Sequence, residues 1–223
     1  MKRPIATMIS SALFGSSLLL SSAASAEFTG NVGVTSNYLW RGMTQTDNMP
    51  AVSGGLDAEM GGLSFGTWVS NVSWTDTDGY EVDFYAAYGG DIGAVSYSVG
   101  AIYYMYPVGD GEDDFTEVNA SLGSGPVTAN VAYTVSKEAD TDFENDLYYS
   151  LGAEFEVSSG LTLSGLVGYY DFDDPSSDDQ TNYQLALAKD LGDFGGVTFA
   201  FDDTDADDSD ALLTVSWSKS FDL

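Results

Sequence analysis

Carboxylates dominate the chemistry that this chain could perform. Its 223 residues include 35 Asp and Glu but six Lys and Arg, and it contains neither Cys nor His. Without Cys there is no thiolate nucleophile, disulfide or thiolate metal site. Without His, the usual general base and the commonest transition-metal ligand are absent. We therefore predict that the protein is not an enzyme and has no cofactor. The shortage of cations also argues against a nucleic-acid partner, because phosphate binding requires Lys and Arg.

Eight charged residues fall on the polar side of alternating segments, where they could line a passage. Rings of carboxylates attract cations and repel anions, so such a set predicts a cation-preferring pore. The alternative is an interior whose charges are solvated or paired and fill a narrow barrel. If the segments form a barrel across an outer membrane with both chain ends in the periplasm, four of the eight would lie near its outer mouth, namely Arg41, Glu81, Asp83 and Glu117. The other four, Asp57, Glu59, Glu154 and Glu156, would lie towards the periplasm.

Two acidic runs could bind Ca²⁺ or Mg²⁺, which prefer carboxylate oxygens. The candidate ligands are Asp171, Asp173 and Asp174 in the first run and Asp203, Asp205 and Asp207 in the second. Neither run has the Gly and distal Glu of a twelve-residue calcium loop. A solvated acidic loop is therefore the simpler interpretation, and no firm metal site is predicted. A more modest hypothesis is that divalent ions bridge these loops to lipid phosphates.

The first 26 residues have the order of a secretory signal peptide. Lys2 and Arg3 precede an apolar stretch, and small residues ending at Ala26 follow it. The apolar stretch is shorter than the ~20 residues that a membrane-spanning helix needs. We predict that residues 1–26 are cleaved after Sec-type export and that residues 27–223 form a single domain.

About twelve segments of the remaining chain alternate between apolar and polar residues, which is the period of β-strands. Short Gly-rich connections alternate with longer and mostly acidic ones. This plan predicts an all-β fold, a twelve-stranded antiparallel transmembrane β-barrel with short periplasmic turns and longer extracellular loops. A sheet in lipid must close, because unpaired backbone groups at an edge are too costly there. A secreted β-sandwich also alternates, but it gives no reason for short and long connections to take turns.

The first predicted strand, residues 28–41, carries Arg41, the only arginine beyond the export segment. Alternation places Tyr38 and Trp40 on its lipid side, within an outer aromatic girdle. We predict that Arg41 forms an ion pair with Asp210 on the last strand, since the first and last strands must meet to close the barrel. The alternative is a cation at the narrowest part of a pore. Residues 63–74 alternate less cleanly, which favours a bulge.

Three stretches resemble a known family. They are residues 31–46 (NVGVTSNYLWRGMTQT), 50–57 (PAVSGGLD) and 80–86 (YEVDFYA). They resemble the TorF-type porin family of Gram-negative bacteria, also called Gcw_chp, and the resemblance covers the whole chain beyond residue 26. It implies an outer-membrane barrel and a pore, and it supplies no substrate or functional residues.

The end of the chain also resembles outer-membrane barrels in general. Those barrels end with apolar residues at alternate positions and an aromatic residue, and Leu213, Val215, Trp217 and Phe221 fit this pattern. The resemblance implies recognition by the barrel-insertion machinery. Together these observations predict an outer-membrane, porin-like channel for small polar solutes or cations, in contact with lipid and lipopolysaccharide. The alternative is a non-conducting structural or surface-interaction barrel whose acidic loops bind divalent cations.

Overall fold

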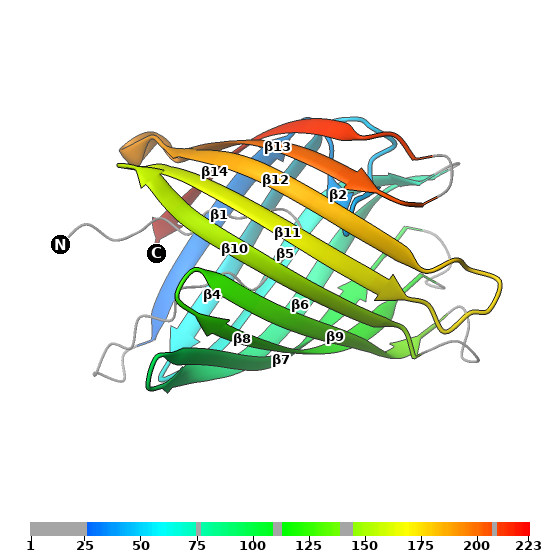
Figure 1. Ribbon diagram of the computed structural model, residues 1–223, viewed down its shortest axis with the longest axis horizontal. Coiled ribbons are helices and arrows are strands. Elements are labelled where there is room, and N and C mark those ends of the chain that lie inside the picture. The colour runs from blue at the N-terminus through cyan, green and yellow to red at the C-terminus, as the bar shows by residue number, and fades with distance from the viewer. Residues whose placement is uncertain (1–25, 75–76, 109–112, 139–144, 207–208) are drawn as a thin grey trace.

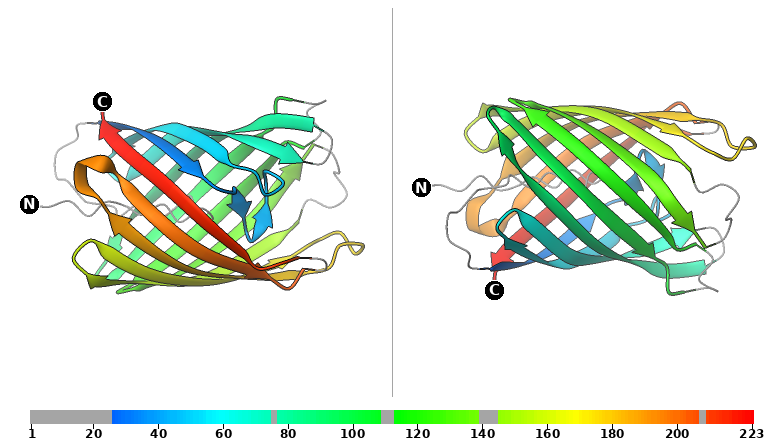
Figure 2. Two further views of the ribbon diagram at one scale, coloured as in Figure 1. Left: turned by 90° about the horizontal axis from the view of Figure 1, so that it is seen from above. Right: turned by 90° about the horizontal axis from the view of Figure 1, so that it is seen from below.

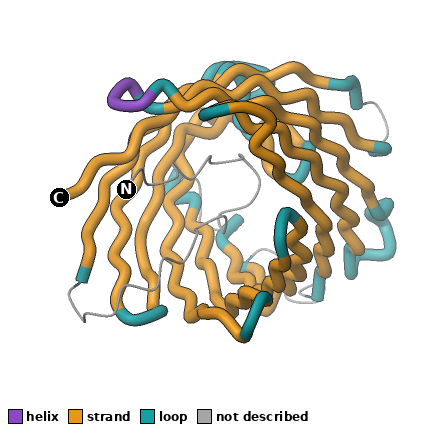
Figure 3. The backbone as a smooth tube through the Cα atoms, turned by 60° about the vertical axis from the view of Figure 1, so that its left-hand side comes forward, coloured by secondary structure: helices purple, strands orange, loops and turns teal. Residues whose placement is uncertain are grey.

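Twelve long strands form a closed antiparallel barrel in the computed structural model, which describes residues 26–74, 77–108, 113–138, 145–206 and 209–223 (Figure 1). The strands follow one another around the barrel from β1 through β14 and β13 to β4, which returns to β1. Figure 3 shows them closing around an interior. The predicted twelve-stranded antiparallel barrel is therefore confirmed. The predicted signal peptide falls, except for Ala26, outside the described residues.

The barrel strands are 9 to 16 residues long. They are β1 (Glu27–Thr35), β4 (Ala51–Met60), β5 (Leu63–Trp74), β6 (Thr77–Ile92), β7 (Val95–Met105), β8 (Phe115–Ser124), β9 (Val127–Lys137), β10 (Leu147–Ser158), β11 (Leu161–Asp171), β12 (Gln180–Asp190), β13 (Gly196–Thr204) and β14 (Leu212–Asp222). Three short elements complete the fold, β2 (Leu39–Trp40), β3 (Met43–Thr44) and the 3-10 helix η1 (Gly192–Phe194). Among the described residues, no helix is long and apolar enough to cross a membrane.

Side chains alternate between the outside and the inside of the barrel as the sequence predicts. On the outside, Val52, Leu185 and Leu213 are 61%, 56% and 79% exposed. Their inward neighbours Ala186 and Thr214 are buried. A continuous apolar surface of this kind is unfavourable in water and favourable in contact with lipid. The alternation therefore sorts the chain into a lipid-facing surface and an interior.

The two ends of the barrel differ in their connections. Tight turns lie at the end where the chain terminates, and Gly61, Gly62 and Gly160 supply the positive φ angles that such turns require. The connections at the other end are longer, with one exception. Strands β5 and β6 remain paired up to Trp74 and Thr77, so the acidic loop predicted after Trp74 is shorter than expected.

The first strand is shorter than predicted. β1 ends at Thr35, and residues 36–49, which we call the inward hairpin, leave the sheet. β2 and β3 pair within this segment and lie inside the barrel, towards the end opposite the chain termini (Figure 2). Leu39 is 3% exposed and Thr46 is fully buried. The prediction that Tyr38 and Trp40 face lipid is therefore wrong, because the strand that would place them there ends before them.

Strand β5 contains no bulge, contrary to the prediction. Its pairing with β4 and β6 runs without a register shift. The inward residues Trp68 and Val72 are apolar because the inward hairpin covers them: Trp68 meets Tyr38 edge-on, and Val72 joins a buried inner cluster with Ile102 and Tyr104. The irregular alternation in the sequence thus results from the inward hairpin that occupies the interior at this level.

Candidate functional site: a hairpin inside the barrel

The tip of the inward hairpin is a two-residue turn formed by Arg41 and Gly42. Trp40 pairs with Met43 across it, and the φ angles of Arg41 and Gly42 are +52° and +85°. Two positive φ values are typical of a type I′ turn, in which Asn or Gly normally precedes Gly. An arginine held there costs about 1–2 kcal/mol of backbone strain. The contacts of its side chain must offset that cost.

Arg41 reaches from the hairpin to the far wall of the barrel. It is 6% exposed, and its Nη2 donates a hydrogen bond of 2.7 Å to Oε2 of Glu117 on β8. Its guanidinium carbon also lies 4.1, 4.2 and 4.8 Å from the ring centroids of Trp40, Tyr148 and Tyr170. A buried cation with a carboxylate and three aromatic faces around it is strongly held.

The predicted ion pair between Arg41 and Asp210 is corrected by this geometry. Arg41 does not lie on the seam strand, since β1 ends at Thr35, and its guanidinium points across the lumen to Glu117. Asp210 is exposed and precedes β14, which begins at Leu212. Backbone pairing closes the seam instead, from Thr29 opposite Asp222 to Thr35 opposite Ser216.

Tyr38 provides a second anchor for the hairpin. Its hydroxyl donates to Oε1 of Glu81 at 2.8 Å, and the hydroxyl of Tyr106 donates to Oε2 of the same carboxylate at 2.8 Å. Asp83, two residues further along β6 and on the same face, is completely buried. These two acids, for which the sequence left both a pore lining and a filled interior open, therefore lie buried under the hairpin.

Polar bonds within the inward hairpin make it a unit with its own structure. The Asn37 side chain accepts from the hydroxyl of Thr44 at 2.7 Å and donates to Oδ1 of Asn48 at 2.9 Å. The hydroxyl of Thr46 donates to the carbonyl oxygen of Met49 at 2.6 Å and accepts from the backbone N–H of Tyr38 at 3.1 Å. These bonds satisfy groups that would otherwise be orphaned on leaving the sheet.

An aromatic layer fills the space between the hairpin and the wall. The Trp40 ring meets the rings of Tyr104, Phe115 and Tyr170 edge-on, with centroids 6.2, 6.0 and 5.7 Å apart. Tyr104 and Phe115 are stacked at 4.3 Å. Such pairs contribute about 0.5–1.5 kcal/mol each beyond their burial. The inside of the barrel thus contains a packed core at the hairpin level.

The interior is more open towards the chain termini. Glu154 and Glu156 are exposed there, and Asp57 and Glu59 are partly exposed. Asp57 accepts from the amide of Asn31 at 3.0 Å and also from the Tyr85 hydroxyl. The predicted lining residues therefore divide into two sets. Arg41, Glu81, Asp83 and Glu117 come together around the hairpin, whereas Asp57, Glu59, Glu154 and Glu156 do not join them.

Sequence reasoning missed the aromatic part of this site. Tyr38 and Trp40 were predicted to face lipid, and no role in a site was predicted for Tyr104, Tyr148 or Tyr170. One signal could have found them. Large apolar residues stand at inward positions of several strands, although a water-filled lumen calls for small polar ones.

The acidic loops use their carboxylates to shape turns. Oδ1 of Asp174 accepts from the N–H of Ser176 at 2.8 Å, which holds the pKa of Asp174 below its usual value. The N–H of Thr181 does the same for the pKa of Asp205. Within the described ranges, no three acids converge on a possible metal position. The weak metal candidates Asp171, Asp173, Asp174, Asp203 and Asp205 thus do not form such a group in the described ranges, and Asp207 lies outside them.

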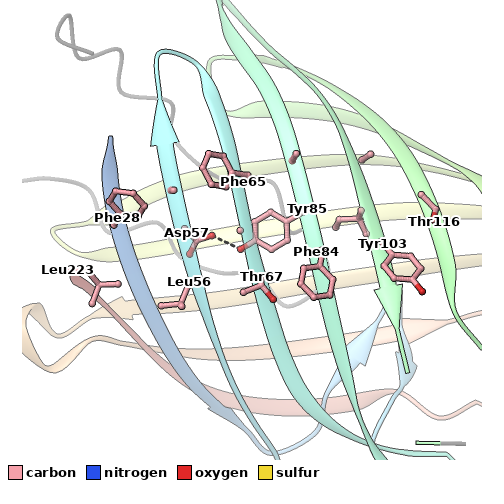
Figure 4. A pocket seen from close by; sticks show the side chains of 15 residues that line it. Phe28, Leu56, Asp57, Phe65, Thr67, Phe84, Tyr85, Tyr103, Thr116 and Leu223 are labelled. Carbon is pink, nitrogen blue, oxygen red and sulfur yellow. Dashed lines mark hydrogen bonds between the residues drawn. The ribbon is translucent and has the colours of Figure 1, made fainter. Parts of the chain in front are cut away.

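One hollow lies on the outer surface of the barrel, across β1 and β4 to β8 (Figure 4). Phe28, Phe65, Phe84 and Tyr103 project along it. Figure 4 also shows the hydrogen bond between Tyr85 and Asp57 on the other side of the wall. Because most of the lining side chains are apolar and share the lipid-facing parity, this hollow suits acyl chains rather than a polar solute.

The solved structures that resemble the chain in fold include two with TM-scores above 0.5. The COG4313 outer membrane channel from Pseudomonas putida F1 aligns with a TM-score of 0.53 at 13% identity, covering 90% of this chain and 97% of that chain. A chain from work on the in-meso crystallization of membrane proteins aligns with a TM-score of 0.56 at 10% identity, covering 88% of this chain and 83% of that chain. At these identities the likeness shows a shared barrel fold alone. No curated protein sequence matches this chain.

A family model described as "Bacterial protein of unknown function (Gcw_chp)" matches residues 20–220. The match includes every barrel strand except the last residues of β14. It also includes the inward hairpin with Arg41, whose sequence carried the resemblance. The chain therefore belongs to the Gcw_chp family of bacterial proteins.

Proposed function

We propose that the protein is an outer-membrane channel for small polar solutes, with a preference for cations, whose passage is closed by the inward hairpin. The observation that carries this proposal is the position of the hairpin. It lies inside a closed barrel with an apolar outer surface, anchored to the opposite wall through Arg41 and Glu117. Beyond it, the interior is lined by exposed acids.

The chemistry of the anchors supports a movable plug. Hydrogen bonds and one ion pair tie the hairpin to β6 and β8, and water can replace these polar contacts when the hairpin leaves. The ring contacts of Tyr38 and Trp40 with the wall oppose its release. The inward hairpin also keeps most of its polar bonds within itself, as between Asn37 and Thr44. It can therefore leave the wall as a unit without breaking a strand of the barrel.

Deletion of the hairpin tests the proposal. Thr35 of β1 is paired with Ala51 of β4, so an Asn-Gly turn can replace residues 36–50 without moving either strand. We expect the refolded variant to give larger and more frequent conductance steps in a planar bilayer than the full chain. An absence of conductance in the deletion variant would contradict a channel.

Cation preference follows from the acids in the open half. In a salt gradient, the reversal potential of the deletion variant should indicate cation selectivity. Replacing Glu154 and Glu156 with Gln should reduce that selectivity, whereas Asp174→Asn in an outer loop should change it less. Anion selectivity, or unchanged selectivity in the double variant, would show that these acids do not determine ion selectivity.

One observation favours the alternative of a non-conducting structural barrel. Arg41, Glu81, Asp83 and Glu117 are all buried, so side chains fill the barrel at the level of the hairpin in this conformation. A barrel that never conducts, with or without its hairpin, would support that alternative. In either case we propose an outer-membrane location, contacts with lipid and lipopolysaccharide, and recognition of β14 by the insertion machinery after Sec-type export.

A further inference from the structure

The guanidinium of Arg41 lies in a cage built mainly by the barrel wall. The wall contributes the Glu117 carboxylate at 2.7 Å and the rings of Tyr148 and Tyr170 at 4.2 and 4.8 Å. These three residues belong to β8, β10 and β11. The hairpin itself adds one ring, that of Trp40, at 4.1 Å. Without the hairpin, the wall would still present a carboxylate beside two aromatic faces.

The wall side of the cage is held in place by bonds that do not involve the hairpin. The hydroxyl of Tyr148 donates to Oδ1 of Asn182 at 3.1 Å, and that of Tyr170 donates to Oδ2 of Asp146 at 3.4 Å. Asp146 is itself paired with Lys137 at 2.6 Å. Groups oriented in this way bind a ligand without the cost of ordering them first.

Arg41 fits this cage imperfectly. Its backbone has a φ of +52°, which a non-glycine residue rarely adopts. Its Nη1 is buried and has no hydrogen-bond partner among the described residues. A free cation would suffer neither the backbone strain nor a tether that fixes the angle of its donors. The cage is therefore better suited to a free cation than to the tethered guanidinium of Arg41.

We propose that this cage is a binding site for a free organic cation of the guanidinium type, and that Arg41 occupies it until such a cation displaces the hairpin. The rings of Tyr148 and Tyr170 are 79° apart, so a planar guanidinium can lie flat on one of them and meet the other with its edge. Its N–H groups can at the same time donate to Glu117. Strongly hydrated inorganic cations gain less from ring faces, and anions are repelled by the carboxylate. The inference rests on the proposed function in one respect, that the cation reaches the cage through the lumen.

Calorimetric titration with methylguanidinium tests the site directly. Arg41→Asn empties the cage and leaves Asn-Gly, a favoured sequence for this turn, so the hairpin keeps its fold. We expect the refolded Arg41→Asn variant to bind methylguanidinium at least tenfold more tightly than the wild type, whose own arginine competes. Adding Glu117→Gln should weaken that binding at least tenfold. Heat-induced mobility on gels verifies that each variant has formed its barrel.

Several outcomes would overturn the proposal. The first is that folded Arg41→Asn does not bind methylguanidinium. The second is that adding Glu117→Gln leaves this binding unchanged. The third is that urea, which has a similar shape without the charge, binds equally well. Tetramethylammonium binding as tightly as methylguanidinium would overturn the assignment of the guanidinium class. Arg41→Gly, which also suits a positive φ, serves as the second variant if Arg41→Asn does not fold.

The wild type provides an independent measurement. Trypsin cleaves after Arg41 when the hairpin is released, so methylguanidinium should accelerate cleavage there in a saturable way, and urea at the same concentration should not. No acceleration would contradict displacement. Failure of the site and failure of the channel remain distinguishable. Binding without conductance in the hairpin-deleted barrel would refute the channel alone, and conductance without binding would refute the site alone.

Discussion

Arg41 and Glu117 are 76 positions apart in the sequence, and their side chains meet at 2.7 Å inside the barrel. The pair joins a turn that has left the sheet to a strand on another part of the wall. Three aromatic rings surround the guanidinium of this pair. The hydroxyl of Tyr104 also donates to the same carboxylate oxygen of Glu117 at 3.4 Å. Backbone contacts also hold the hairpin to the wall, since the N–H of Ser73 on β5 donates to the carbonyl oxygen of Gln45 at 2.8 Å.

Glu117→Gln should release the hairpin. Removing one partner of a buried ion pair leaves the other charge unpaired, which costs about 3–5 kcal/mol. We expect trypsin to cleave after Arg41 at least 100-fold faster in this variant. Glu138→Gln, which changes an exposed acid, is the matched control and should leave the cleavage rate unchanged. Equal rates in the two variants would show that the ion pair does not hold the hairpin.

Tyr38→Phe should weaken the second anchor. The change removes the hydroxyl that donates to Glu81 at 2.8 Å and leaves the ring against Trp68. A hydrogen bond to a charged group contributes about 1.5–3 kcal/mol. Cleavage after Arg41 should therefore rise about tenfold or more. Tyr80→Phe, on the lipid side of β6, should leave the cleavage rate unchanged. An equal increase in cleavage in that variant would show that the Tyr38 hydroxyl does not anchor the hairpin.

Gly42→Ala separates a steric clash from backbone strain. A Cβ at Gly42 would lie 3.0 Å from Cβ of Asn182, and its φ is +85°. Gly93 has a φ of +66° with nothing within 4 Å, so Gly93→Ala introduces strain without a clash. Both variants should lose about 1 kcal/mol or more of unfolding free energy from strain. Gly42→Ala alone should also increase trypsin cleavage after Arg41, and an equal increase in Gly93→Ala would rule out the clash.

Gly30→Ala should disturb the closing seam. A Cβ there would lie 2.6 Å from the Phe221 ring, which covers this glycine from the neighbouring strand. We expect a lower midpoint in urea unfolding of the barrel in vesicles, and partial recovery when Phe221→Leu makes room. Gly152→Ala is the control, since its nearest neighbour atom is 3.6 Å away. The account of the seam fails if the two glycine variants unfold alike.

The strands and their orientation could be predicted because a barrel in lipid imposes a simple rule on sequence. Val52, Leu185 and Leu213 face outward because each stands at the apolar position of a two-residue period. That rule is local, so it requires no knowledge of distant contacts. The same rule extended the first strand to Arg41, since Asn37 and Arg41 keep the polar parity and Tyr38 and Trp40 the apolar one, although Leu39 interrupts the pattern.

The site could not be predicted because its contacts are not local. Alternation cannot distinguish a strand that stays in the sheet from one that ends at Thr35 and turns inward, since both bury every second residue. The turn at Arg41 also carries a residue that β-turn preferences disfavour. Trp68 and Val72 gave the available evidence of an occupied lumen, and a bulge explained the same pattern as well.

A reversible disulfide across the lumen tests the central claim most directly, that the inward hairpin closes the channel. A Cβ at Gly42 would lie 3.4 Å from Cβ of Thr204 on β13, close to the ~3.5–4.5 Å that disulfides span. The same Cβ lies 3.0 Å from Cβ of Asn182, so the disulfide holds the hairpin against this clash when oxidised, and the clash favours release when the disulfide is reduced. The chain has no cysteine, so Gly42→Cys with Thr204→Cys introduces a single pair. The account predicts a silent barrel in the planar bilayer when the pair is oxidised and conductance steps when it is reduced, with Gly42→Cys alone insensitive to reductant. Equal conductance in the oxidised and reduced states of the double variant would contradict it.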